Sequence, residues 1–280
     1  MKLLIKSAVK NFIIFSTALY TSISLAQNKL AIVIDDVGYH LKEDAAIFAI
    51  PREISVAIIP AAPHARARNQ EAKSQGRDIL IHMPMQPVSA VKIEDGGLHL
   101  GMSSAQVNDR VNTAKNIVNY AIGMNNHMGS AATADPQLMT YLMTALQEKH
   151  LFFLDSRTIG KSVAGKIAKE QGVRSLDRHI FLDDSNELAD VQHQFQAAIQ
   201  YARKHGTAIA IGHPRPNTIA VLQAGINNLP EDIQLVGMGN LWRNEKVIPP
   251  KPFILLFTEM PAPTSMEPFE PVGLLRGIPK

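Results

Sequence analysis

Short apolar runs alternate with longer amphipathic segments along most of the chain, and this pattern limits the possible folds more than any other feature. Each apolar run has the length of a strand, and the segment after it has the length of a helix. Strands that are apolar throughout are buried on both faces, which requires helices on both sides of a parallel sheet. The sequence therefore predicts an α/β fold.

The strands and helices can be placed from this pattern and from their end signals. Buried strands are predicted at residues 30–34, 54–59, 79–82, 151–154, 207–211 and 233–236, and helices at 41–49, 64–75, 103–122, 161–171, 189–205 and 218–227. Ser103 with Gln106 has the pattern of a capping box, and Asp135 followed by Pro136 that of a helix start. We interpret the whole as a distorted or partial (β/α) barrel of roughly seven to eight β/α units, with a doubly wound open sheet as the alternative.

The first 26 residues have the three parts of a secretory signal peptide. Three lysines make a basic start, residues 12–19 are mostly apolar, and the segment ends in small residues at Ser24 and Ala26. We predict cleavage after Ala26, export across the inner membrane and a periplasmic or extracytoplasmic location. The alternative is a membrane anchor, but the apolar segment is short for a span of about 20 residues, and no later segment approaches that length.

Composition narrows the class of protein further. Without Lys2, Lys6 and Lys10, the 28 Lys and Arg become 25, equal to the 25 Asp and Glu. A chain without net charge or a basic tract is not expected to bind nucleic acid. The absence of Cys excludes a disulfide scaffold and a thiolate metal site. We predict one domain over residues 27–248 and a Pro-rich tail over 249–280, which holds eight of the 17 prolines.

Acidic and imidazole side chains recur where predicted strands end, the place at which a barrel gathers distant residues. They are Asp35 and Asp36 after 30–34, His82, His127 in the polar segment 123–130, Asp155 with Arg157 after 151–154, and His213. Adjacent side chains on an extended chain point to opposite faces, so one carboxylate of the Asp35-Asp36 pair can bind a cation while the other addresses a water. One carboxylate and two imidazoles suit Zn²⁺.

Each of these residues also has a structural interpretation. The Asp pair fits a helix N-cap, the segment around His127 fits a tight turn, and Arg157 fits a structural ion pair. We interpret the acidic pair Asp183-Asp184 as solvent-exposed residues that cap a helix. Their joint placement at the strand ends is what favours a functional site.

In chain order, five segments resemble the divergent polysaccharide deacetylase family, which is related to metal-dependent carbohydrate deacetylases. The resemblance covers roughly residues 30–241, and the segments are Ile34–Gly38, His82–Met85, Gly123–Ser130, Asp155–Thr158 and Ile211–Pro214. The related deacetylases have a distorted (β/α) barrel, which agrees with the pattern of strands and helices.

The resemblance implies roles for individual residues. Asp35 matches a general base, Asp36 the adjacent metal ligand, His82 the first His of a two-His metal motif, and His213 a general acid. The second His of that motif would fall at Gln86, and we expect His127 to supply this imidazole instead. Asn126, Asp155 and Arg157 are expected to bind substrate, with Arg157 either contacting substrate or anchoring Asp155.

The function that the resemblance implies is an exported hydrolase that uses Zn²⁺ or another divalent transition metal. It would remove acetyl or other acyl groups from an N-acetylated polysaccharide or a peptidoglycan-type glycan. One alternative, prompted by Gln86, is a catalytically weak or inactive module of the cell envelope that binds glycan or protein. Another is a metal hydrolase of phosphoesters or peptides, which the lack of a phosphate-cradling Gly loop disfavours. The sequence predicts no oligomeric state.

Overall fold

The computed structural model of the chain describes residues 28–244, 265–266 and 270–271. The chain divides into two units, residues 1–244 and 245–280. In the second unit, β10 (Ser265–Met266) pairs with β11 (Glu270–Pro271) in antiparallel fashion. The expected signal peptide and most of the expected tail lie outside the described residues, so both remain predictions.

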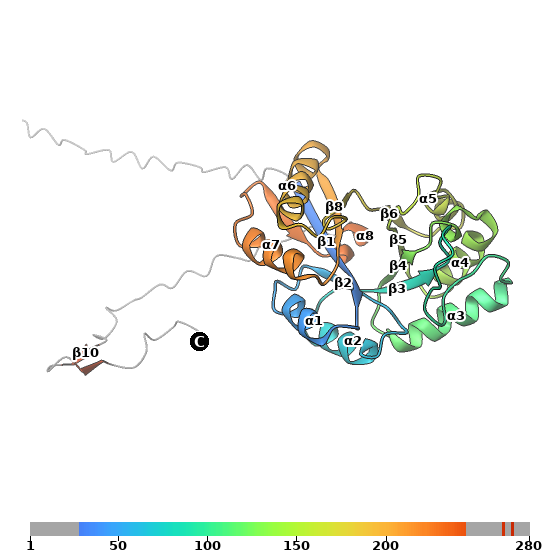
Figure 1. The fold of residues 1–280 in the computed structure, drawn as a ribbon, viewed down its shortest axis with the longest axis horizontal. Coiled ribbons are helices and arrows are strands. Elements are labelled where there is room, and N and C mark those ends of the chain that lie inside the picture. The colour runs from blue at the N-terminus through green and yellow to red at the C-terminus, as the bar shows by residue number, and fades with distance from the viewer. Residues whose placement is uncertain (1–27, 245–264, 267–269, 272–280) are drawn as a thin grey trace, which may run out of the picture. The chain divides into compact units, whose positions relative to one another are not determined.

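The described part of the first unit alternates strands and helices along its length (Figure 1). In chain order the elements are β1 (Asn28–Val37), α1 (Leu41–Phe48), β2 (Ser55–Ile58), α2 (Ala65–Ser74), β3 (Ile79–Met85), α3 (Ser104–Ile117), β4 (Gly123–Met128), a 3₁₀ turn (Ala132–Ala134), α4 (Pro136–Glu148), β5 (Phe152–Asp155), α5 (Ala164–Glu170), β6 (Ser175–Asp177), β7 (Ile180–Phe181), α6 (Leu188–His205), β8 (Thr207–Gly212), α7 (Pro216–Ile226), β9 (Ile233–Val236) and α8 (Met238–Arg243).

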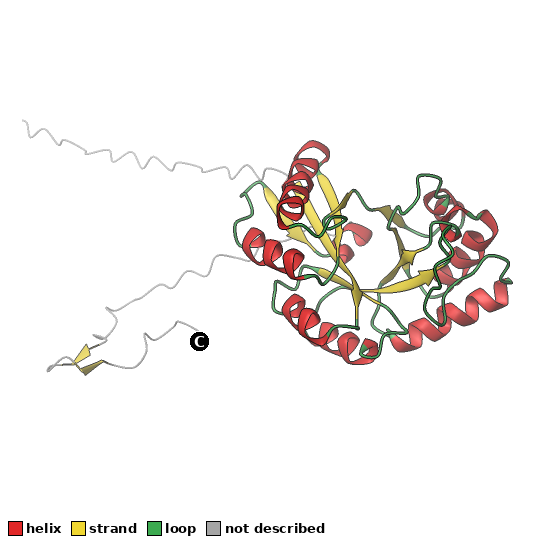
Figure 2. Ribbon diagram, in the orientation of Figure 1, coloured by secondary structure: helices red, strands yellow, loops and turns green. Residues whose placement is uncertain are grey.

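The strands of this unit form one parallel sheet that curls into a partial barrel, which confirms the predicted fold class. Neighbouring strands follow the order β6-β5-β4-β3-β2-β1-β8-β7, and β9 also pairs with β1. The two ends of this path, β6 and β7, are separated in the sequence only by Arg178 and His179. The helices pack outside the strands (Figure 2), so the carboxyl ends of the strands meet at one mouth of the barrel.

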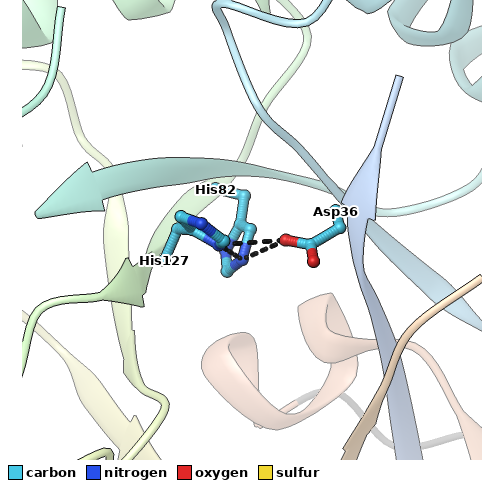
Figure 3. Close-up of side chains that lie close together, drawn as sticks. All are labelled: Asp36, His82 and His127. Carbon is cyan, nitrogen blue, oxygen red and sulfur yellow. Dashed lines mark hydrogen bonds and ion pairs between the residues drawn. The ribbon is translucent and has the colours of Figure 1, made fainter. Parts of the chain in front are cut away.

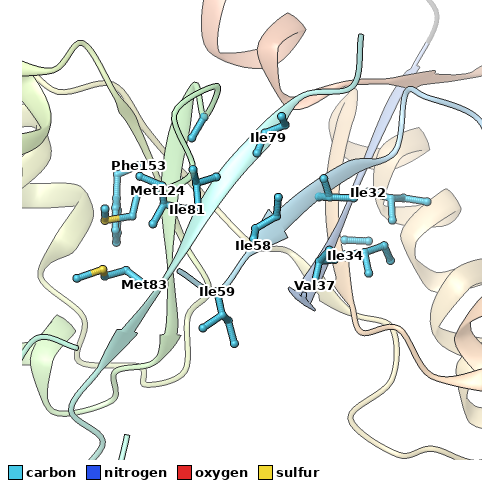
Figure 4. Close-up of a cluster of buried hydrophobic side chains, with 14 of the residues drawn as sticks. Ile32, Ile34, Val37, Ile58, Ile59, Ile79, Ile81, Met83, Met124 and Phe153 are labelled. Atoms are coloured by element: carbon cyan, nitrogen blue, oxygen red, sulfur yellow. The ribbon is translucent and has the colours of Figure 1, made fainter. Parts of the chain in front are cut away.

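The core explains why the strand sequences are continuously apolar. Residues 30–34 of β1 are fully buried, and Ile32, Ile34, Ile58 and Ile81 contribute to one cluster of buried side chains (Figure 4). Because helices cover the outer face and side chains fill the inner face, none of residues 30–34 contacts water. None of the helices in residues 28–244 combines the length and apolar composition that crossing a bilayer demands.

Two predicted helix starts are confirmed in detail. The Ser103 hydroxyl accepts from the Gln106 N–H while the Gln106 side chain accepts from the Ser103 N–H, which completes the capping box of α3. The Asp135 carboxylate accepts from the Leu138 N–H at the start of α4.

The interpretation of residues 123–130 as a turn was wrong, because Gly123–Met128 form β4 in the middle of the sheet. Strand β4 was not predicted because its polar Asn and His side chains interrupt the apolar pattern of a buried strand. These polar side chains are held by hydrogen bonds with side chains of other strands. Strands β6 and β7 and helix α8 were also not predicted, since they are too short to show a period.

Gly123 offers a test of how α8 supports β4. A methyl group at Gly123 would lie 2.5 Å from Cη2 of Trp242, and the buried Trp242 ring also stacks on Phe152 at 5.1 Å between centroids. We expect Gly123→Ala to lower the free energy of unfolding by about 1–3 kcal/mol, because the ring must move. Urea denaturation measures this. Gly160→Ala, where nothing lies within 4 Å, should change it by less than about 0.5 kcal/mol; equal stability of the two variants would contradict the packing argument.

Candidate functional site

Four residues from four distant segments converge at the carboxyl ends of the strands. Asp36 lies near the end of β1, His82 on β3, His127 on β4, and His213 directly after β8. Their separation in the sequence is bridged by the parallel sheet, which brings these strand ends together. Figure 3 shows the first three side chains pointing toward one another.

Asp36, His82 and His127 form a cluster that we call the donor triad. Asp36 Oδ1 lies 3.2 Å from His82 Nε2 and 3.0 Å from His127 Nδ1, and the two nitrogens are 3.1 Å apart. Donor atoms around one tetrahedral ion with bonds of about 2.0–2.1 Å are roughly 3.3 Å apart. Asp36 Oδ1 is buried and makes no hydrogen bond among the described residues. The residues present therefore fit a divalent metal ion.

A β-bulge brings the two adjacent carboxylates to the same place. The pairing of β1 with β2 shifts register between Ile34 and Val37, and Asp36 has a left-handed φ of 56°. As a result Asp35 Oδ2 and Asp36 Oδ1 lie 3.5 Å and 3.2 Å from His82 Nε2. The expectation that these side chains point to opposite faces was wrong, because it assumed an extended backbone at Asp36.

The register of β3 and β4 explains which imidazoles meet. His82 pairs with Asn125 and Pro84 pairs with His127, so His127 lies two residues beyond the partner of His82 and on the same face. Residue 86 lies four positions beyond His82, which on an extended strand is roughly 13 Å. Gln86 instead accepts a hydrogen bond from the Leu100 N–H, and so holds the loop that follows β3.

Asn125 links the Asp35 carboxylate to the His82 imidazole. Its Nδ2 donates to Asp35 Oδ1 and Oδ2 at 2.8 Å and 3.0 Å, and its Oδ1 lies 2.9 Å from His82 Nδ1. A carboxylate only accepts, so the amide oxygen must face His82 and accept from Nδ1. This leaves Nε2 of His82 as the nitrogen that faces Asp36. The link that Asn125 makes between Asp35 and His82 was not predicted, because both partners lie on other strands.

Glu94 stands behind the other imidazole of the donor triad. Its Oε1 lies 3.5 Å from His127 Nε2, and its Oε2 is buried without a hydrogen-bond partner among the described residues. A carboxylate on this side favours a hydrogen on Nε2 and leaves Nδ1 to face the triad, which is the usual second layer of a metal-binding His. Glu94 lies in the loop after β3 and was not predicted as a site residue.

The charges of this cluster shift its pKa values strongly. Burial lowers the pKa of His82, but the Asp35 and Asp36 carboxylates outweigh it and raise that pKa to about 9. Burial acts to raise the pKa of Asp36, but the His127 and His82 imidazoles hold it well below its usual range. Burial raises the pKa of Asp35, and His82 and His213 offset part of that rise. A metal ion entering the triad would therefore displace a proton.

His213 lies on the other side of Asp36 and is held by Asp183. His213 Nε2 is 3.9 Å from Asp36 Oδ2, while its Nδ1 lies 2.8 Å from Asp183 Oδ1. Asp183 Oδ2 accepts from the His213 N–H and from the Thr218 hydroxyl. Burial lowers the pKa of His213, but Asp183 outweighs it and the net shift is upward. The interpretation of Asp183 as solvated capping was wrong, since Asp183 is buried.

Asn126, Asp155 and Arg157 lie outside the donor triad. Asn126 donates to the Met128 carbonyl and accepts from the Ser156 N–H. The buried Asp155 accepts from the Arg157 N–H and the Ser162 hydroxyl, and the Arg157 guanidinium lies 3.9 Å from it. These bonds shape the turn after β5, and contact of the three residues with substrate stays a prediction.

A cleft of about 420 Å³ opens over the donor triad. Its lining includes Asp36, Tyr39, Glu94, His127, His213 and Arg215. Asp35 and His82 lie beneath it, each 2% exposed. A metal site with one carboxylate and one imidazole beside it, open to a cleft, is an arrangement suited to activating a water for hydrolysis.

Comparison with known proteins gives a consistent set of relatives. The model of the divergent polysaccharide deacetylase family matches residues 32–242. An uncharacterized protein of Haemophilus influenzae is 92% identical over 280 residues, 100% of both chains. The uncharacterized protein YibQ of Escherichia coli is 43% identical over 245 residues, 86% of this chain and 77% of YibQ. A crystal structure of an uncharacterized Agrobacterium tumefaciens protein shares the fold, with a TM-score of 0.71 and 21% identity over 78% of this chain and 90% of that one.

Asn125→Leu tests the link between Asp35 and His82. Leu has a similar volume but cannot hydrogen-bond, so His82 loses the group that orients it. We expect the affinity for Zn²⁺ to fall about 10–100-fold, measured by competition with a chromophoric chelator. Asn112→Leu makes the same change at an exposed position of α3 and should leave the affinity unchanged. Equal affinity of the Asn125→Leu variant and the parent protein would refute this role.

Asp183→Asn tests the electrostatic support of His213. The pKa of His213 is raised in the folded protein chiefly because the Asp183 carboxylate outweighs burial, so neutralising Asp183 should lower that pKa. The ring signals of His213 in an NMR pH titration of the metal-free protein report it. Asp184→Asn removes the same charge from the exposed neighbouring residue and should shift the pKa far less. A His213 pKa that does not fall in the Asp183→Asn variant would show that another group sets it.

Proposed function

Because this chain belongs to the divergent polysaccharide deacetylase family, we propose that it is an exported, metal-dependent hydrolase of acylated glycans. The bond cleaved is the amide of an N-acetylated sugar, in a polysaccharide or a peptidoglycan-type glycan. The observation that carries the proposal is the donor triad, with Asp35 on one side and His213 on the other.

Asp36, His82 and His127 would hold the metal ion, and one carboxylate with two imidazoles suits Zn²⁺ or another divalent transition metal. Such an ion polarises an acyl carbonyl and lowers the pKa of a bound water. Asn125 and Glu94 orient the two imidazoles so that Nε2 of His82 and Nδ1 of His127 face the same point as Asp36 Oδ1.

Asp35 acts as the general base. Its Oδ2 lies 3.5 Å from His82 Nε2, next to the donor triad, so it can take a proton from a water held there. Burial raises its pKa, which makes the carboxylate a stronger base than an exposed Asp. The two hydrogen bonds from Asn125 fix its orientation.

His213 acts as the general acid. Asp183 binds its Nδ1 and leaves Nε2 on the side of Asp36 and the cleft. The raised pKa of His213 keeps the ring protonated up to a higher pH than an isolated imidazole. The proton on Nε2 is then available to the amine that leaves when the amide bond breaks.

The proposed location is the periplasm or another extracytoplasmic space. It rests on the basic start, the apolar middle and the small-residue end of residues 1–26. Glycans of the cell envelope are found there, and so the location agrees with the proposed substrate class.

Four substitutions test the division of labour in the site. Asp35→Asn and His213→Ala should lower the release of acetate from N-acetylated oligosaccharides by about 10²–10⁴-fold while leaving the bound metal in place. His82→Ala and His127→Ala should lose the metal itself, measured by elemental analysis of protein purified without chelator. His193→Ala, on the exposed face of α6, is the control and should retain both.

The alternative function predicts a different pattern. A protein that binds glycan but holds no stoichiometric metal and releases no acetate is a binding module, and the proposal is then wrong. Full turnover by Asp35→Asn would contradict the role of Asp35 as general base, and full turnover by His213→Ala the role of His213 as general acid. Neither result would contradict the metal site.

A further inference from the structure

A second cavity, of about 440 Å³, opens at the same mouth of the barrel. We call it the arginine cavity; its lining includes Arg157, Thr158, Arg178, Phe181, Asp184 and Gln194. The first four of these residues follow β5 or belong to the β6–β7 region, at the carboxyl ends of the strands. The Phe181 ring stacks on the His213 ring with centroids 5.8 Å apart, so the arginine cavity lies next to the proposed general acid.

Arg157 presents an unused guanidinium to this cavity. Among the described residues this group makes no hydrogen bond, and its nearest acid, Asp155 Oδ2, is 3.9 Å away and already bonded to the Ser162 hydroxyl. The backbone beneath it is fixed. Arg157 has a left-handed φ of 52°, its N–H donates to Asp155 Oδ1, and its carbonyl accepts from Arg178 Nη2. A fixed backbone that carries a guanidinium with unused hydrogen-bond donors is suited to holding a ligand.

Arg178 adds a second, rigidly held guanidinium. Its Nε donates to the Ser156 carbonyl at 2.7 Å, and its Cζ lies 4.1 Å from the centroid of the Phe181 ring. Asp184 is the acid on the lining, and His179 Nδ1 accepts from the Ile209 N–H. The lining thus holds two guanidiniums and one carboxylate, and the buried Asp155 carboxylate lies next to Arg157. The guanidinium donors that make no hydrogen bond suit a monoanion.

The neighbouring cleft offers fewer guanidinium groups and more carboxylates. Asp36, Glu43 and Glu94 line it together with a single arginine, Arg215, so an anionic substituent of a substrate finds more guanidinium donors in the arginine cavity. A planar guanidinium with free donors binds a carboxylate in a bidentate manner. The different donors of the two cavities would thus orient a glycan across them.

We propose that the arginine cavity binds the carboxylate of an acidic N-acyl glycan whose acyl group occupies the cleft over the donor triad. The inference rests on the proposed function for that cleft and adds a substrate class to it, namely glycans that carry a carboxylate close to the acylated sugar. Arg157 is the residue that selects this carboxylate.

The probes are two oligosaccharides of the same length, with alternating N-acetylglucosamine and N-acetylmuramic acid. One keeps its carboxylates, and in the other they are reduced to alcohols. Calorimetry on the metal-loaded protein should show tighter binding of the carboxylated form, with an advantage that shrinks as salt is added. Arg157→Gln should weaken binding of that form on the order of tenfold and leave the reduced form unchanged.

Two further variants sharpen the test. Arg52→Gln removes the same charge ahead of β2, at the opposite end of the strands, and should change neither affinity. Asp184→Asn removes the acid on the lining and should tighten binding of the carboxylated form, an effect that damage to the fold would not produce. Circular dichroism confirms that each variant is folded.

The outcomes separate this inference from the proposed function. Equal affinity of the parent protein for the two probes, no binding of either, or an equal loss of both in Arg157→Gln overturns the arginine cavity as a subsite. Equal acetate release from both probes also overturns it and leaves the hydrolase in place. Preferential binding of the carboxylated probe without acetate release supports the subsite and refutes the hydrolase.

Discussion

A carboxylate oxygen and two imidazole nitrogens lie 3.0–3.2 Å from one another at the mouth of the barrel, and the surrounding structure is organised around their approach. Three electron-rich atoms at this distance, in a largely buried cluster, require a positive charge between them. Without metal that charge is a proton, as the raised pKa of His82 indicates. With metal it is the ion. Binding of a metal ion by the cluster would therefore replace a proton with the ion.

The neighbouring residues make this approach possible. The bulge in β1 turns Asp36 toward β3, and the register of β3 with β4 places His82 and His127 on one face. A second layer then sets which nitrogen of each ring faces inward. Asn125 does so for His82, Glu94 for His127 and Asp183 for His213. Each of these partners comes from a different part of the chain, so the site depends on the complete sheet and not on one loop.

The parts of the site that follow apolar runs in the sequence could be predicted, and the parts that depend on backbone geometry or distant contacts could not. Apolar runs such as those of β1, β3 and β8 predicted the fold, and the side chains at their ends included Asp36, His82 and His213. Strand β4 was concealed because Asn125, Asn126 and His127 replace the apolar residues of a buried strand. The left-handed φ of Asp36 could not be predicted, because two consecutive aspartates do not indicate a β-bulge. Asn125, Glu94 and Asp183 act through hydrogen bonds or ion pairs to distant segments, which no local pattern records.

The short helix α8 supports the sheet through one residue, Trp242. Its ring fills the space beside Gly123 and stacks on Phe152, and so covers the amino ends of β4 and β5. The stretch matched by the family model ends at this residue. A truncation placed before Trp242 would therefore leave a hole beneath the strand that carries Asn125 and His127. The Trp242 indole thus supports, from the opposite end of the sheet, the strand that carries two residues of the candidate site.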